Sequence, residues 1–370
     1  MTTQSPQTLM KQPTLNTSYH ENRLRFSKEL FERGDMMPFR YVFVLTNKCN
    51  LRCSFCFQDK GNHPGSMTKD DWLKVIDQLP AYAHVTLTGG EPLLFKGFEE
   101  IFLAITKKHT CNVISNGVLL NTKTVELLLS QPNFKVLSIS VDNVENTIRD
   151  VPSEKWAHTK ETLAYFRRRR SELGAQTVLD TKTVVLDENT EDLYRIHRYC
   201  LEDLGADTHT FMFLKGSPIQ HADSMVPPES MWQESKAHKY LRFDLVLDQL
   251  EQVRVYNRLN GRRGFTHPKT IDLNSDHSVH AADFGYLNAE DHEKSLFHGC
   301  RGPWESVHIN NDGSLFPCMA IGMGNVKTSS LQKIIFGQPF EEFKAIIRRE
   351  GTVAACNRCG YLCPKNKGNA

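Results

Sequence analysis

Residues 40–57 read RYVFVLTNKCNLRCSFCF, an apolar run typical of a strand followed by a loop with three cysteines. Five more apolar runs, separated by amphipathic segments, cover residues 84–88, 111–115, 136–141, 179–186 and 209–214. Strands that alternate with helices predict a parallel α/β sheet, whose right-handed crossovers curl it into a wound sheet or an open barrel. Polar motifs directly after several runs favour the barrel, because parallel barrels build active sites at that edge. We therefore expect a partial (βα)6 barrel, of the TIM type, over residues 39–218.

The segments outside the expected barrel have a different character. Residues 1–38 predict a polar N-terminal arm, and residues 219–299 predict an insertion that shapes the substrate pocket, with a helix over 232–254. Residues 304–318 read WESVHINNDGSLFPC, which predicts a β-hairpin around the Asn-Asp-Gly turn. A helix is expected over 331–350. Residues 300–370 therefore predict a small C-terminal domain made of a hairpin and a helix.

Composition excludes several classes of protein. The chain has 45 Lys and Arg against 43 Asp and Glu, unlike the basic composition of a nucleic-acid binder. No window approaches the ~18 consecutive apolar residues of a membrane span. The first twenty residues lack the apolar run of a signal peptide, so we expect a cytoplasmic protein without nucleic-acid or membrane partners. Because cytoplasmic thiols stay reduced, clustered cysteines indicate metal or redox chemistry before disulfides.

The loop after the first strand spaces Cys49, Cys53 and Cys56 as Cx3Cx2C. A disulfide framework would leave one thiol over and needs an oxidising compartment. Structural zinc usually takes four ligands, one more than this loop supplies. Three thiolates can instead hold three irons of a 4Fe-4S cubane and leave the fourth iron open for chemistry. The cubane therefore fits the number of cysteines best.

This loop, with Phe55 just before its last cysteine, resembles the signature of the radical S-adenosylmethionine (SAM) superfamily. The resemblance implies a 4Fe-4S cluster whose open iron binds the amino and carboxylate groups of SAM. It also implies reductive cleavage of SAM to a 5′-deoxyadenosyl radical, which abstracts a hydrogen from the substrate. Such an enzyme needs a reductant as partner, for example flavodoxin or ferredoxin.

Three later motifs directly follow predicted strands: TGGEP (88–92), SNG (115–117) and SVDN (140–143). Taken alone, each is also a common turn sequence. They resemble family segments that contact SAM, with Glu91 accepting from its ammonium. Lys182 lies inside the fifth strand, where it meets the SAM carboxylate or simply faces solvent. The resemblance implies cofactor-binding roles for Phe55, Gly89, Gly90, Glu91, Asn116, Ser140, Asp142 and Lys182.

A second group of cysteines lies near the end of the chain. Its order, Cx12Gx4C, then a gap, then CxxC, resembles the SPASM/twitch extension, which binds an auxiliary iron–sulfur cluster. The tail departs from the full SPASM pattern, so we expect one auxiliary 4Fe-4S cluster, with structural zinc as the alternative. A further cysteine can replace one of the four ligands or donate a hydrogen atom, and the sequence leaves this open. The candidate metal ligands are Cys300, Cys318, Cys356, Cys359 and Cys363.

The auxiliary cluster suggests the type of reaction. A cluster near the barrel mouth can accept an electron from a substrate radical, which makes the net reaction an oxidation. We therefore expect a radical SAM oxidoreductase of the maturase type that modifies a peptide. The alternatives are a dehydrogenase or epimerase of a sugar-like or aminocyclitol-like molecule, and a non-catalytic iron–sulfur or zinc protein. Fold and cofactor alone do not choose among these reactions.

Overall fold

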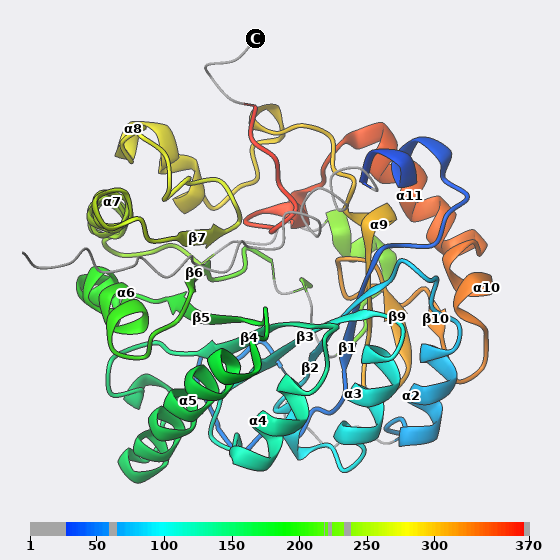
Figure 1. Cartoon of the computed structure of the whole chain (residues 1–370). Coiled ribbons are helices and arrows are strands. Elements are labelled where there is room, and N and C mark those ends of the chain that lie inside the picture. Colours follow the sequence, from blue (N-terminus) through cyan, green and yellow to red (C-terminus); the bar gives the residue numbers. More distant parts are fainter. Residues whose placement is uncertain (1–26, 59–64, 218, 221–223, 233–237, 366–370) are drawn as a thin grey trace, which may run out of the picture.

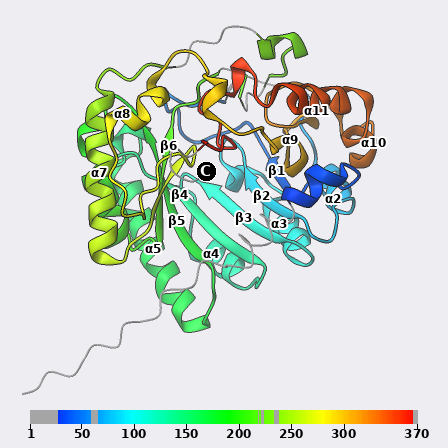
Figure 2. The same ribbon diagram turned by 90° about the horizontal axis from the view of Figure 1, so that it is seen from above.

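The computed structural model describes residues 27–58, 65–217, 219–220, 224–232 and 238–365, so most of the expected N-terminal arm lies outside it. Parallel strands pair in chain order and form the curved sheet seen in Figures 1 and 2. Each lies within two residues of a predicted run, and the partial-barrel expectation is confirmed. The strands are β1 (Arg40–Val44), β2 (His84–Thr88), β3 (Thr110–Ser115), β4 (Phe134–Ser140), β5 (Val178–Val185) and β6 (Thr208–Phe213).

Helices cover the outer face of this sheet (Figure 2). Alternate strand residues, such as Tyr41 and Phe43, direct their side chains toward these helices and are fully buried. Thr68 and Asp71 form a capping box at the start of the first helix of this layer. The helices are α2 (Lys69–Ile76), α3 (Phe98–Thr106), α4 (Thr122–Leu129), α5 (Ser153–Leu173), α6 (Leu193–Glu202) and α7 (Phe243–Asn260).

The sheet is larger than the expected barrel. Strand β7 (Gly264–His267) adds in parallel beside β6, and β8 (Ser306–Ile309) adds in parallel beside β1. The predicted hairpin is present, because β8 pairs antiparallel with β9 (Ser314–Phe316), and β10 (Gly324–Asn325) follows. The order of the ten strands is β10-β9-β8-β1-β2-β3-β4-β5-β6-β7. The C-terminal hairpin thus continues the barrel sheet.

Two helix predictions need correction. Instead of one helix over 331–350, the chain forms α10 (Leu331–Ile335) and α11 (Gln338–Glu350), with Pro339 in the first turn of the second. Helix α7 begins at Phe243 rather than at 232, and it extends to Asn260 rather than 254, ending at Gly261, whose φ is 59°. Part of the predicted 232–254 helix, residues 233–237, lies outside the described residues. Residues 27–33 are also helical and bury Leu30, so this part of the expected polar arm is an ordered, packed element. The other helices of the described chain are short: α8 (Ala281–Phe284), α9 (Gly302–Glu305), η1 (Pro92–Leu94), η2 (Thr147–Arg149), η3 (Thr190–Asp192), η4 (Pro228–Trp232), η5 (Gly285–Asn288), η6 (Lys294–Leu296) and η7 (Ala354–Cys356).

One apolar core runs from the helices under β1–β4 to the C-terminal helices α10 and α11. A second, smaller core lies between β5, β6 and α7. None of the helices within the described ranges is both long enough and apolar enough to cross a bilayer.

Candidate active site

The predicted motifs meet at the carboxyl edge of the strands. The diglycine after β2 lies against the loop that leads from β1 to the first cysteine: a Cβ on Gly89 would lie 2.6 Å from the Thr46 carbonyl oxygen, and one on Gly90 would lie 2.3 Å from that of Lys48. Gly90 N–H donates to Thr46 O (2.7 Å), and Glu91 N–H donates to Lys48 O (2.9 Å). The two glycines are therefore required for backbone packing beside the cysteine loop.

The first cysteine group has hydrogen-bond donors directed at its sulfurs. Cys49 Sγ accepts from Leu51 N–H at 3.4 Å and from the Asn116 side-chain amide at 3.8 Å. The guanidinium of Arg149 lies 3.9 Å from Cys53 Sγ. Cys56 belongs to the same turn, since its N–H donates to Cys53 O at 3.2 Å. Donors around sulfur stabilise thiolates, so the residues present fit an iron–sulfur cluster.

Glu91 is fully buried, and its carboxyl group is already bonded within the chain. It accepts from Ser115 Oγ (2.9 Å), Asn116 N–H (2.9 Å) and Leu93 N–H (3.1 Å). Burial raises the pKa of Glu91 to about 7, against the opposing effect of these three hydrogen bonds. The side chain therefore joins the ends of β2 and β3, and an ammonium group would meet a carboxyl that already accepts three hydrogen bonds. Its predicted contact with SAM stays a prediction.

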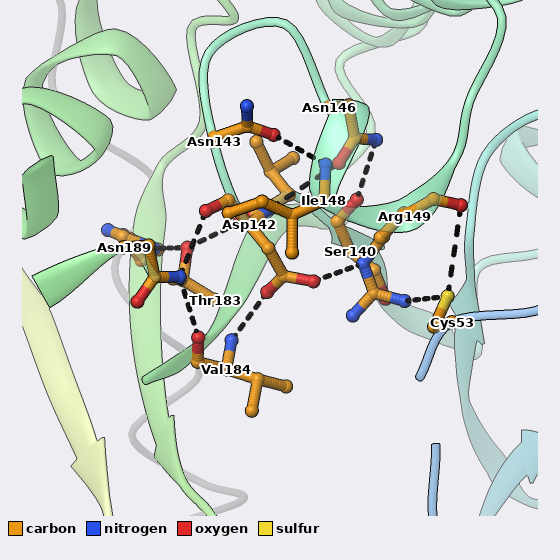
Figure 3. Close-up of polar contacts among 12 residues, drawn as sticks. Cys53, Ser140, Asp142, Asn143, Asn146, Ile148, Arg149, Thr183, Val184 and Asn189 are labelled. Atoms are coloured by element: carbon orange, nitrogen blue, oxygen red, sulfur yellow. Dashed lines mark hydrogen bonds and ion pairs between the residues drawn. The ribbon is translucent and has the colours of Figure 1, made fainter. Parts of the chain in front are cut away.

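Asp142 is also fully buried and bonded (Figure 3). Its carboxylate lies 2.5 Å from Arg149 Nε and accepts from Val184 N–H at 2.6 Å. Burial raises the pKa of Asp142, and the Arg149 guanidinium opposes that shift. Arg149 also lies over the ring of Phe55, 5.3 Å from its centre, so it joins the end of β4 to the cysteine loop. Ser140, at the end of β4, is half-buried, and its carbonyl accepts from Asn146 at 3.4 Å.

Lys182 is paired on the inner face of the barrel. Its Nζ lies 2.7 Å from Asp180 Oδ2, and 24 % of its side chain is exposed. Asp180 also accepts from Ser138, Thr208 and Thr210, at 3.1, 2.7 and 3.2 Å. The barrel interior is therefore polar where β4, β5 and β6 meet. A SAM carboxylate would compete with Asp180 for Lys182, so that role remains a prediction.

The second cysteine group lines a pocket at the junction of the hairpin and the C-terminal loop. Burial raises the pKa of the Cys300 and Cys318 thiols, and the neighbouring cysteines raise it further; the pKa of Cys356 is raised to about 12 by burial and then by Cys359. These mutual effects require the four thiols to lie close together. Gly302 N–H donates to Cys300 Sγ (3.2 Å) and Val353 N–H to Cys356 Sγ (3.4 Å). The lining is Gln220, Cys300, Pro303, Cys318, Met319, Ile347, Ala355, Cys356, Cys359 and Tyr361.

Cys363 does not line this pocket and is exposed. Within the described ranges, no three His, Cys, Asp or Glu side chains are arranged to hold a single metal ion. The pocket lining brings Cys300, Cys318, Cys356 and Cys359 together, so these four cysteines fit the auxiliary iron–sulfur cluster expected from the sequence.

A short segment after β6 joins the two cysteine groups. Lys215 Nζ lies 4.0 Å from the centre of the exposed Phe57 ring, directly after the first group, and donates to Gln220 O at 3.2 Å. The Gln220 side chain donates to Ala355 O (2.5 Å) and Asn357 O (2.8 Å), on either side of Cys356. Lys215 and Gln220 therefore connect the segment after the first cysteine group to the loop that carries Cys356.

Arg358, between the last two pocket cysteines, anchors this loop. It is buried, its φ is 50°, and its guanidinium donates to the carbonyls of Leu214 (3.4 Å), Leu287 (2.6 Å) and His238. No motif in the sequence identifies Arg149, Asp180, Lys215, Gln220 or Arg358 as part of the site. Contacts between distant residues, such as Arg149 with Cys53 and Gln220 with Asn357, reveal them only in the structure, and the only local signal is that Arg358 lies within CxxC.

The chain matches two family models. One, described as "Radical SAM superfamily", matches residues 43–200, and the other, SPASM, described as "Iron-sulfur cluster-binding domain", matches residues 300–360. The sporulation killing factor maturation protein SkfB of Bacillus subtilis (strain 168) is 26% identical over 304 residues, or 80% of this chain. That alignment spans 65% of the length of SkfB.

Solved structures show the same fold. SuiB of Streptococcus suis bound to the precursor peptide SuiA matches with a TM-score of 0.62 and 16% identity, over 97% of this chain and 80% of SuiB. The structure of anSMEcpe with bound AdoMet matches with a TM-score of 0.57 and 15% identity, over 90% of this chain and 88% of that one. At these identities the similarity concerns the fold alone.

Proposed function

We propose that this chain, which belongs to the radical SAM superfamily and carries a SPASM domain, oxidatively modifies a peptide substrate. Its cofactors are 4Fe-4S clusters and SAM. When bound, these cofactors supply a 5′-deoxyadenosyl radical that takes a hydrogen from the substrate. The observation that carries the peptide class is the similarity to the maturation protein SkfB over 80% of the chain.

The residues have separate tasks in this proposal. Cys49, Cys53 and Cys56 would hold the SAM-binding cluster, and the four pocket cysteines would hold the auxiliary cluster. Gly89 and Gly90, packed against the loop from Thr46 to Lys48, would hold the rim beside the cysteine loop in the position where SAM binds. Glu91 and Asn116 would act mainly by fixing the ends of β2 and β3, because their polar groups bond to one another and to the cysteine loop.

The substrate would bind between the two cysteine groups. Phe57 exposes 54 % of its surface directly after Cys56, and Lys215 lies over its ring. An aromatic ring and an ammonium at this place can hold a peptide chain by apolar contact and by a hydrogen bond to a carbonyl or carboxylate. An electron released by the substrate would then have an acceptor at the nearby pocket cysteines. We expect the protein to work in the cytoplasm, with flavodoxin or ferredoxin as reductant.

Anaerobic turnover tests the proposal. The reconstituted holoenzyme is incubated with SAM, a reductant and a short peptide encoded beside its gene, and the products are followed by mass spectrometry. We expect 5′-deoxyadenosine together with a peptide that has lost two hydrogen atoms, and neither product from the Cys49→Ala/Cys53→Ala/Cys56→Ala variant. Conversion of an aminocyclitol with no change in any peptide would refute the peptide class. If protein with its full content of iron and sulfide forms no 5′-deoxyadenosine, the proposal that it is an enzyme is refuted.

A further inference from the structure

We infer that Arg149 is a positioning residue for the first cysteine group: it places a positive charge at Cys53, and Asp142 orients it. The inference depends on the cluster site alone and not on the identity of the substrate. Arg149 comes from η2, in the loop after β4, and reaches across the rim to Cys53 (Figure 3). The contact runs in both directions, because Cys53 Sγ also lies 3.9 Å from the carbonyl oxygen of Arg149.

The guanidinium is held on three sides. Asp142 pairs with its Nε at 2.5 Å, Cys53 Sγ lies 3.9 Å from one terminal nitrogen, and the Phe55 ring lies against its plane. Only 13 % of the Arg149 side chain is exposed, whereas the exposed fraction of Asp142 is 0 %. A surface arginine would be screened by water and free to move. This one is fixed next to a sulfur that carries negative charge once it binds iron.

The loop around Arg149 is fixed by its own side chains. Asn146, at φ 56°, accepts from Asp142 N–H and donates to Ser140 O, both at 3.4 Å. Asn143 accepts from Ile148 N–H at 3.2 Å. Asp142 is tied to the next strand by Val184 N–H. A loop that served only to connect β4 to α5 would not need this network, so we assign the network to holding Arg149 in place.

The charge has a predictable effect on the cluster. Hydrogen bonds to the sulfurs and nearby charges set the reduction potential of an iron–sulfur centre. Reduction adds negative charge, so a fixed cation at Cys53 favours the reduced form. Replacing the cation with a neutral side chain should lower the equilibrium constant for reduction about tenfold, equivalent to about 59 mV for a one-electron couple. Replacing Asp142 with Asn removes the compensating anion and should shift the potential in the opposite direction.

The experiment is an anaerobic redox titration of reconstituted wild type, Arg149→Gln, Arg149→Lys and Asp142→Asn. Paramagnetic resonance follows the signal that changes when SAM is added, which separates the first cluster from the auxiliary one. Iron retention under a chelator is measured in parallel. The matched control is Arg169→Gln, which removes an arginine paired with Glu126 at 2.9 Å on α5.

We expect a more negative potential and faster iron loss in Arg149→Gln, partial recovery in Arg149→Lys, a more positive potential in Asp142→Asn, and no change in the control. A purely structural role predicts iron loss in all three variants at this site with no opposite shifts in potential. That pattern, or a wild-type potential in Arg149→Gln with a full iron content, would overturn the inference.

Discussion

Gly360 provides a sharp test of how the second cysteine group is positioned. It follows Cys359 and passes the ring of His267 at the end of β7. A Cβ at Gly360 would lie 1.8 Å from His267 Cε1 and 2.1 Å from Nε2. Ordinary contact begins at about 3.4 Å, so Gly360→Ala must move the loop or the ring by about 1.6 Å.

That displacement is large compared with what a metal ligand tolerates. Ligand distances in metal sites hold to within about 0.2 Å, and Cys359 is the residue next to the new methyl group. Overpacking of this kind typically costs about 1–3 kcal/mol. We therefore expect Gly360→Ala to lose the auxiliary iron, from about eight irons per chain to about four, while the first group keeps its own.

The assay is iron and sulfide quantification after anaerobic reconstitution, with thermal unfolding of the same samples. Gly299→Ala is the matched control: it lies beside Cys300, has no positive φ, and its Cβ would meet no atom closer than 3.9 Å. The double variant Gly360→Ala/His267→Ala should regain iron, because the smaller side chain leaves room for the methyl group. A Gly360→Ala protein with as much iron as Gly299→Ala would refute the reasoning.

Three further predictions follow from the site and the core. Burial lowers the pKa of His197 to about 4 in the folded chain, whereas its pKa in the unfolded chain is about 6.5. Between pH 7 and pH 5 the unfolded chain therefore takes up a proton at His197 that the folded chain does not. Lowering the pH from 7 to 5 should decrease the free energy of unfolding by about 2 kcal/mol through this residue. Urea unfolding at both pH values checks this, and His197→Asn should reduce the difference by about that amount, because burial also lowers the pKa of His209, His267, His292 and His308, which keep their own contributions. Cys356→Ser should lose the auxiliary iron, whereas Cys363→Ser should keep the iron content of the wild type. If an iron assay finds the same loss in both variants, Cys363 is a ligand of the auxiliary cluster. Lys215→Met should lower the ratio of modified peptide to 5′-deoxyadenosine, measured by chromatography, and an unchanged ratio would remove Lys215 from substrate binding.

The strands of the barrel were predictable because each is an apolar run buried on the side of the helices. Strand β7 was not, since its sequence, Gly-Phe-Thr-His, has no apolar run. It forms because β6 offers a free edge and because the Asn274 side chain binds both backbone groups of Gly264, at 3.2 and 2.8 Å. Such partners are invisible to a local pattern.

Asn189 shows how a correct local signal can have a different physical cause. Asparagine is a common N-cap residue, and Asn189 stands directly before η3, but its side chain makes no cap hydrogen bond there. It instead donates to Asp142 O and Val184 O, at 3.0 and 2.9 Å, and so joins the ends of β4 and β5. Asn189 therefore links two strands rather than capping a helix.

The site motifs carry a similar ambiguity. Glu91 and Asp142 follow their strands as in the family motifs, and that resemblance implies that both contact the cofactor. In the structure both carboxylates are fully buried and bonded to neighbouring loops. A residue that touches a ligand and one that fixes the loop around it can leave the same motif. Only the contacts of the side chain in the structure distinguish these two roles. Arg149, which pairs with Asp142, follows it by seven residues and belongs to no recognisable motif.

The contacts of the C-terminal domain make it part of the barrel. Strand β8 covers the edge of β1, which would otherwise be exposed for four residues. The turn of the hairpin holds the segment after the first cysteine loop, with Met67 N–H donating to Asn311 O at 2.6 Å and Lys327 Nζ to Gly65 O at 2.5 Å. At the other side of the rim, Arg358 and Gln220 tie the pocket loop to the end of β6. The two cysteine groups are therefore fixed relative to each other by the same domain that supplies the second one. In the proposed reaction, a substrate bound beside the first cysteine group would pass an electron to a cluster at the second group. Such a transfer needs a fixed distance between the two groups.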